Sequence, residues 1–74
     1  MANLLSSKRG QYTTIKGISV LAPIKIKRRL LELGFTRGVK ARVVRKSLLG
    51  NAYMIELRGY TLTLRKDIVS FLQI

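Results

Sequence analysis

The chain is 74 residues long and strongly basic, because 15 Lys and Arg face only three acidic residues and give a formal net charge of +12. This length suits one domain, residues 1–74, near the lower limit at which a single core is stable alone. Cysteine is absent, which excludes a disulfide framework. No apolar run approaches the roughly 20 residues of a membrane span, and Met1–Leu5 is too short and uncharged for a signal peptide. The sequence therefore predicts a cytoplasmic protein.

The first half of the chain predicts a strand followed by a helix. The segment Tyr12–Ile18 is rich in β-branched residues, which is typical of a strand. A helix is expected over Pro23–Leu33, because proline suits the first helical position. Gly34 supplies the left-handed residue on which helices commonly end, and Phe35 beyond it can fold back onto Leu30. These signals predict a Schellman-type helix end.

The second half alternates apolar and polar side chains in three successive runs. Residues 39–44, 53–58 and 60–65 each show the period of two that predicts a half-buried strand. Turn chemistry separates the runs, first at Leu49–Asn51 and then at Gly59. The sequence therefore predicts a hairpin followed directly by a third strand.

The last residues complete the expected fold. Phe71–Ile74 is a short apolar end that predicts an outer strand, whereas Asp67–Ser70 is too short for more than one helical turn. Counting the run after Gly10, the chain has about five short strands, with one helix between the first and the second. Closure hides the strand edges of so small a sheet, so we expect a mainly β fold, a closed or nearly closed barrel.

Several segments, in a fixed order along nearly the whole chain, match the pattern of a known family. They are Ile15 and Ile18, the segment Arg29–Phe35, Gly38, Gly50 with Asn51, and Leu64 with Arg65. Each segment is weak alone, but the ordered set resembles the FeoA-type ferrous iron transport proteins. The resemblance implies a small SH3-like β-barrel of about five strands, with one helix inserted between the first and second strands.

The resemblance also implies a function and a partner. FeoA-type proteins act on FeoB, a membrane-embedded ferrous iron transporter with a cytoplasmic GTP-binding part. The expected role is that of a non-catalytic accessory protein of ferrous iron uptake, which binds the FeoB-type transporter and modulates it. Such a protein would lie in the cytoplasm, or peripherally at the inner membrane through its partner.

The net charge of +12 leaves two other kinds of partner open. The predicted helix and the strand after it could form one positive face that tracks the phosphates of RNA or single-stranded DNA, or that contacts an anionic membrane surface. Beyond Phe35 and Phe71, the candidates for stacking on bases are Tyr12, Tyr53 and Tyr60, although strand spacing places Tyr53 and Tyr60 on the core face. The basic residues of this face are Lys25, Lys27, Arg28, Arg29, Lys40, Arg42, Arg45 and Lys46.

Neither catalysis nor a bound metal or cofactor is expected. Histidine and cysteine are absent, and Glu32, Glu56 and Asp67 fall on separate predicted elements, so paired carboxylates and an activated nucleophile are missing. The same three scattered acids are a poor ligand set for ferrous iron or another transition metal. Gly34 and Gly38 lie between a helix and a strand, which is opposite to the order of a nucleotide-binding loop.

The predicted helix has two apolar faces. At about 100° per residue, three apolar side chains fall on the face that we assign to the core, namely Ile26, Leu30 and Leu33. A second pair falls on nearly the opposite side, flanked by basic residues, and an apolar pair with a basic rim is typical of a protein-docking surface. The candidate partner-binding residues are therefore Ile24, Lys27, Arg28 and Leu31.

A purely structural alternative exists for this second stripe. The N-terminal side chains of Leu4 and Leu5 could fold over Ile24 and Leu31 and bury them within the domain. The sequence alone leaves both interpretations open.

Overall fold

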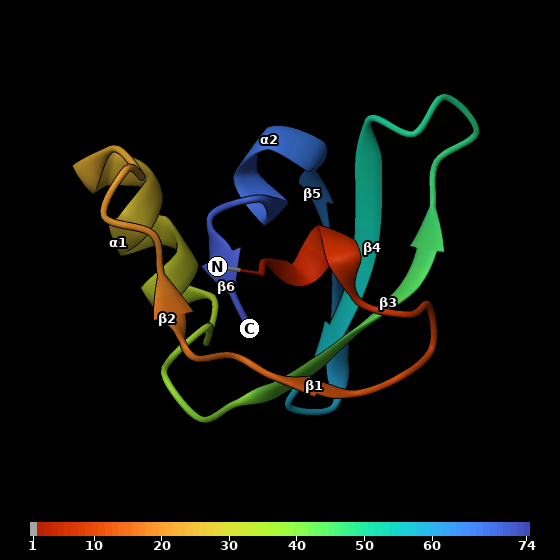
Figure 1. Cartoon of the computed structure of the whole chain (residues 1–74), viewed down its shortest axis with the longest axis horizontal. Helices are drawn as coiled ribbons and strands as arrows, with labels where there is room; N and C mark the ends of the chain where they lie inside the picture. Colours follow the sequence, from red (N-terminus) through yellow and green to blue (C-terminus); the bar gives the residue numbers. More distant parts are fainter. Residues whose placement is uncertain (1) are drawn as a thin grey trace.

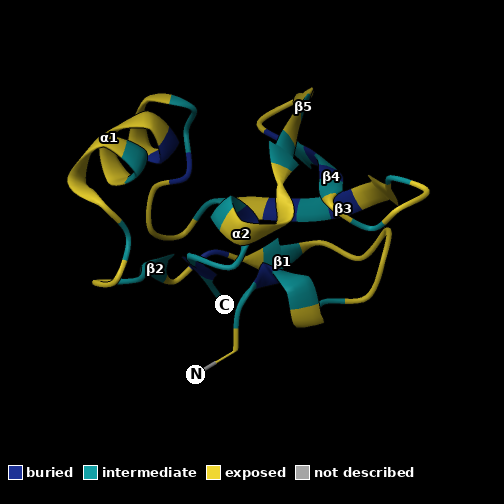
Figure 2. Ribbon diagram, turned by 90° about the horizontal axis from the view of Figure 1, so that it is seen from above, coloured by how far each residue is buried: buried dark blue, intermediate teal, exposed yellow. Residues whose placement is uncertain are grey.

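The computed structural model describes residues 2–74, which form two small antiparallel sheets and one longer helix (Figure 1). Strands β1, β3, β4 and β5 form a four-stranded sheet in that order, and β2 pairs with β6. The helix α1 and the β3–β4 connection lie at opposite ends of the molecule (Figures 1 and 2). In chain order the elements are the 3-10 helix η1 (Leu4–Ser6), β1 (Thr13–Thr14), β2 (Gly17–Ile18), α1 (Ile24–Glu32), β3 (Lys40–Lys46), β4 (Ala52–Leu57), β5 (Tyr60–Arg65), α2 (Lys66–Val69) and β6 (Leu72–Gln73).

The consecutive strands β3, β4 and β5 form the predicted meander. Their registers place Val43 opposite Ile55, and Ile55 opposite Leu62. An irregularity in the pairing between Val43 and Arg45 leaves Val44 without a partner on β4, and from Val44 to Lys46 all residues of β3 are exposed. Elsewhere on β3 and β4 the alternation holds, which confirms the strand prediction. The buried side chains of these two strands are Ala41, Val43, Tyr53, Ile55 and Leu57.

The prediction of one strand over Tyr12–Ile18 is wrong, because this segment forms two short strands in different sheets. The chain changes its pairing partner between two neighbouring residues. The Ile15 N–H donates to the Val39 carbonyl at 2.8 Å, whereas the Lys16 N–H donates to the Gln73 carbonyl at 2.7 Å. One bent segment thus pairs first with β3 and then with β6, and it connects the two sheets into a small barrel. The structure therefore has six strands, where the sequence predicted about five.

The core is formed by buried side chains from every part of the chain. Leu4 of η1, Val69 of α2 and Leu72 of β6 are fully buried beside those of the main sheet (Figure 2). Helix α2 packs on β4, β5 and η1, and it spans one turn, as predicted for this region. The two ends of the described chain also meet, since the Ile74 N–H donates to the Ala2 carbonyl at 3.1 Å.

Helix α1 confirms the prediction for its segment to within one residue at each end. Pro23 and Leu33 are the flanking cap residues: the Pro23 carbonyl accepts from the Lys27 N–H at 2.9 Å, and the Leu33 N–H donates to the Arg29 carbonyl at 3.0 Å. The predicted core face is also confirmed, because Leu30 is buried, while Ile26 and Leu33 are half-buried and pack against the core.

Candidate functional site

The C-terminus of α1 is fixed by the expected Schellman motif. The Phe35 N–H donates to the Leu30 carbonyl at 3.0 Å, and the Gly34 N–H donates to the Leu31 carbonyl at 3.0 Å. Gly34 has a φ of +105°, a conformation that strongly favours glycine. Phe35 and Leu30 are both buried, so the helix end is held by packing as well as by hydrogen bonds.

The turn between β4 and β5 adds a second clamp on the same helix end. Arg58 and Gly59 both have positive φ, as a two-residue hairpin turn with the twist of the strands requires. The Arg58 guanidinium donates to the Gly34 carbonyl at 3.3 Å and to Thr36 Oγ1 at 2.9 Å. The Tyr60 hydroxyl donates to the Leu33 carbonyl. The hairpin therefore satisfies helix-end carbonyls and sets the position of α1 on the barrel.

The face of α1 that points away from the core is open to solvent. Ile24 is 63% exposed and Leu31 is 43% exposed, with Lys27 and Arg28 exposed between them. All four predicted partner-binding residues thus lie on one exposed helical stripe. The alternative in which Leu4 and Leu5 bury this stripe is wrong: Leu4 is in the core and Leu5 lines a depression beside α2.

Two further apolar residues extend this surface, and sequence reasoning missed them. Val20 and Leu21 are 97% and 81% exposed in the turn that leads from β2 to α1. The Ser19 hydroxyl accepts from the Leu21 N–H at 3.1 Å, and the Ala22 N–H donates to the Ser19 carbonyl at 3.1 Å, so the turn is ordered. The available signal was an apolar pair just before the helix-starting proline. We define the helix surface as Val20, Leu21, Ile24, Lys27, Arg28 and Leu31.

The basic residues of α1 and β3 do not form the single positive face that the sequence suggested. Strand β3 runs away from α1, so its last residues, Arg45 and Lys46, lie at the hairpin end of the molecule (Figures 1 and 2). Arg42 is bound to Glu56, with its Nη2 at 2.5 Å from Glu56 Oε1, and its charge is largely neutralised there. The cations therefore fall into separate groups.

The three tyrosines are poorly placed for stacking on nucleic acid bases. Tyr53 is 7% exposed, as expected for the core face. Tyr60 lies on the core face of β5, as expected, since it pairs with the buried Leu57. At this end of the strand it is nevertheless 41% exposed, and its hydroxyl donates to the helix-end carbonyl of Leu33. Tyr12 is exposed, but the guanidinium of Arg42 lies 4.9 Å from its ring centroid and occupies one face of the ring.

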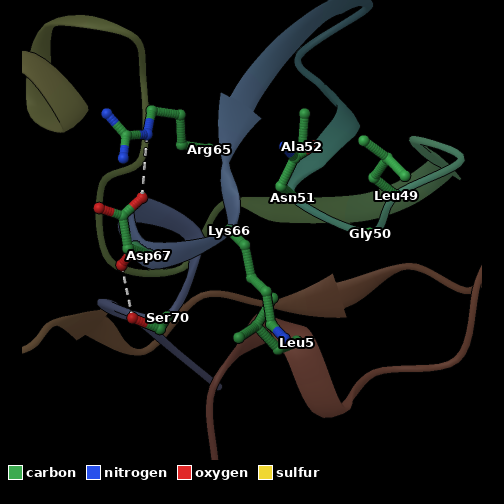
Figure 3. Close-up of a pocket in the computed structure, with 9 residues that line it drawn as sticks. All are labelled: Leu5, Leu49, Gly50, Asn51, Ala52, Arg65, Lys66, Asp67 and Ser70. Atoms are coloured by element: carbon green, nitrogen blue, oxygen red, sulfur yellow. Dashed lines mark hydrogen bonds and ion pairs between the residues drawn. The ribbon is translucent and has the colours of Figure 1, made fainter.

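An open depression lies between η1, the β3–β4 connection and the start of α2 (Figure 3). Within it, Arg65 Nε lies 3.4 Å from Asp67 Oδ1, and the Ser70 hydroxyl donates to the Asp67 carbonyl at 2.5 Å. These charged side chains are largely exposed, so the depression is wet and lacks the dry walls of a typical small-molecule site. It is lined by Leu5, Leu49, Gly50, Asn51, Ala52, Arg65, Lys66, Asp67 and Ser70.

The acidic residues are spread over the molecule. Glu32 lies on α1, Glu56 on β4 and Asp67 on α2. Within residues 2–74, no three His, Cys, Asp or Glu side chains group in a way that could hold a metal ion. In the same part of the chain, no helix combines the length and the apolar character needed to cross a bilayer.

The bent first segment, the three-strand meander and the small second sheet define a mainly β, SH3-like barrel, which confirms the predicted fold class. The sequence model of the FeoA domain matches residues 3–74, and the chain therefore belongs to the FeoA family. This confirms the resemblance inferred from the ordered segments. No curated protein sequence matches the chain.

Solved structures with the same fold include several FeoA proteins. FeoA from Chlorobium tepidum superposes with a TM-score of 0.86 at 28% identity, over 97% of this chain and 67% of its own. The FeoA-like protein of Clostridium acetobutylicum gives 0.82 at 26% identity, over 95% and 79%. FeoA of Stenotrophomonas maltophilia, solved with zinc and described as a procaryotic SH3 domain protein, gives 0.83 at 23%, over 97% and 87%.

Proposed function

We propose that this protein is a non-catalytic accessory protein of ferrous iron uptake. Membership of the FeoA family supports this role, and the Stenotrophomonas protein of the same fold has been put forward as an activating factor of bacterial ferrous iron transport. The partner is a FeoB-type membrane transporter, bound through its cytoplasmic GTP-binding part. The protein acts as one domain, residues 1–74, in the cytoplasm or at the inner membrane through this partner.

The observation that carries the proposal is the helix surface. Its apolar side chains stay exposed although the core of the same domain is closed, and Lys27 and Arg28 rim them. Protein interfaces are built around apolar anchors of this kind, while charges at the rim steer the encounter. The scattered acids, the wet depression and the absence of histidine and cysteine argue that the protein acts by contact and not by catalysis.

The test is a binding titration of the full chain against the purified, lipid-free cytoplasmic part of a FeoB-type transporter. Leu31→Ser should weaken binding by about tenfold, because truncating a central apolar anchor removes much of the contact energy. Leu48→Ser is the matched control, since it makes the same change at a fully exposed leucine at the other end of the molecule. If both variants bind as the wild type does, the partner docks on another surface.

Binding to nucleic acid remains the alternative function, because the net charge of +12 favours any polyanion. The tyrosines count against it, since single-stranded nucleic acid is held by exposed aromatic rings. Tyr53 is buried, the Tyr60 hydroxyl is bonded to the Leu33 carbonyl, and Arg42 occupies one face of the Tyr12 ring. We expect only weak oligonucleotide binding, which disappears as salt is added. A submicromolar, sequence-selective complex at ~150 mM salt would make nucleic acid the preferred partner.

A further inference from the structure

A second exposed apolar pair lies at the opposite end of the barrel from the helix surface. Leu48 and Leu49 occupy the β3–β4 connection, and both are essentially fully exposed. The connection extends to the edge of the molecule, away from α1, in both views (Figures 1 and 2). Single exposed leucines are ordinary, but two adjacent ones at a protruding turn present a compact apolar tip.

This turn is held in one shape by its own hydrogen bonds. The Ser47 hydroxyl accepts from the N–H groups of Asn51 and Ala52, each at 3.1 Å, and donates to Asn51 Oδ1 at 3.0 Å. The Gly50 N–H donates to the Ser47 carbonyl at 2.9 Å. The two leucines between these residues are therefore presented to solvent by an ordered turn, which lowers the entropic cost of inserting them elsewhere.

Three cationic residues lie at the ends of the elements that flank the apolar tip. Arg45 and Lys46 end β3 just before the turn, and Lys66 starts α2 beside it, where its N–H donates to the Asn51 carbonyl at 2.9 Å. Leu49 and Lys66 line the same depression, in which the Lys66 side chain runs toward Leu5 (Figure 3). All three cations are exposed. We define the hairpin tip as Arg45, Lys46, Leu48, Leu49 and Lys66.

We propose that the hairpin tip docks directly on an anionic phospholipid bilayer. Leu48 and Leu49 enter the boundary between headgroups and acyl chains, while Arg45, Lys46 and Lys66 contact lipid phosphates. Stable attachment of a peripheral protein needs two such signals, an apolar insertion and a basic patch, and the tip supplies both. Aliphatic leucines cannot stack on bases as aromatic rings do, so a bilayer matches this surface better than nucleic acid does.

The placement of the two surfaces permits both contacts at once. The molecule measures 29 Å along its longest axis, with α1 at one end and the hairpin tip at the other (Figure 1). A barrel seated on lipid through the tip leaves the helix surface free for a protein. The lipid contact nevertheless stands apart from the transporter partner, because it rests on the tip alone.

The main experiment is co-sedimentation of the full chain with vesicles. One set contains equal parts of dioleoylphosphatidylglycerol and dioleoylphosphatidylcholine, and the other contains only the zwitterionic lipid. Binding should require the anionic lipid, and Leu48→Ser/Leu49→Ser should lower the partition coefficient by about tenfold or more. Lys46→Gln/Lys66→Gln should lower it by about fivefold for each charge removed. Val20→Ser/Leu21→Ser, an equally exposed apolar pair at the other end, is the matched control and should bind normally.

Fluorescence locates the inserted residue, because the natural chain has no tryptophan. Leu49→Trp should shift its emission to the blue on anionic vesicles and be quenched by brominated acyl chains, whereas Leu21→Trp should not. Normal binding by Leu48→Ser/Leu49→Ser, or equal quenching of the two tryptophan variants, would overturn the proposal. Either outcome would leave the transporter contact intact, since that contact is measured without lipid.

Discussion

Two neighbouring leucines on α1 have opposite environments. Leu30 is 1% exposed and packs with Phe35 in the core, whereas Leu31 is 43% exposed on the opposite stripe. The first side chain holds the helix to the barrel, and the second contributes nothing obvious to the fold. The comparison teaches that a core position and an open surface position can be one residue apart on a helix, so substitutions can test the fold and the proposed partner binding separately.

The largest effect on stability is expected at the buried leucine. Leu30→Ala should lower the free energy of unfolding by about 2–5 kcal/mol, because it removes a buried side chain and leaves a cavity. In a domain of this size such a loss is a large part of the total free energy of unfolding. Thermal or urea unfolding measures it. A variant that melts at the wild-type midpoint would show that α1 is not anchored through this residue.

A smaller loss is expected at the helix end. Gly34→Val should cost more than about 1 kcal/mol, because a β-branched side chain is strained at positive φ. The new Cβ would also meet the Tyr60 hydroxyl at 3.1 Å and Arg58 Cδ at 3.2 Å. Gly34→Ala adds the same Cβ without the branch and should lose less in the same melting experiment. An unchanged midpoint for Gly34→Val would contradict the Schellman assignment.

The exposed leucine should hardly affect unfolding. Leu31→Ser and Ile24→Ser should each change the free energy of unfolding by less than about 0.5 kcal/mol, since most substitutions on an open surface are nearly neutral. Melting curves recorded beside those of Leu30→Ala give the comparison directly. Should Leu31→Ser melt as early as Leu30→Ala, the stripe belongs to the core and the assignment of the helix surface is wrong.

The rim charges should have the smallest effect on the fold and a kinetic effect on binding. Lys27→Glu/Arg28→Glu should leave melting nearly unchanged, because both side chains are exposed. The pair should slow association with the cytoplasmic part of a FeoB-type transporter and alter its salt dependence, while dissociation changes little. Stopped-flow measurements at two salt concentrations test this. Equal association rates for the variant and the wild type at both salt concentrations would show that these cations do not take part in the encounter with the partner.

The elements that were predicted well carry local signals. Pro23 and Gly34 bracket the helix, and Gly59 marks the turn between β4 and β5, because each of these residue types favours a particular backbone conformation. The split of the segment Tyr12–Ile18 was missed for the opposite reason. Its two halves pair with strands far along the chain, β3 and β6. The local signal was Gly17, since an isolated glycine within a strand often marks a bend or bulge, but it does not reveal the partners.

The same contrast applies to the candidate site. Helical periodicity placed Ile24 and Leu31 on one stripe, and the structure shows that stripe exposed. Val20 and Leu21 lie in a turn, where no periodicity separates buried from exposed residues, so the pattern could not assign them. Alternation placed Tyr60 on the core face of its strand, but its contact with the Leu33 carbonyl joins distant parts of the chain, which alternation does not encode.

The clamp that the β4–β5 turn places on the end of α1 has a consequence for the order of folding. A helix of nine residues is unstable by itself, and its last carbonyls bind Arg58 and Tyr60, which lie 24 and 27 residues away from their partners. The hairpin closes a short loop and can form first, so α1 should dock after the rate-limiting step. Substitutions in α1 should then show low φ-values, speeding unfolding while leaving the refolding rate nearly constant.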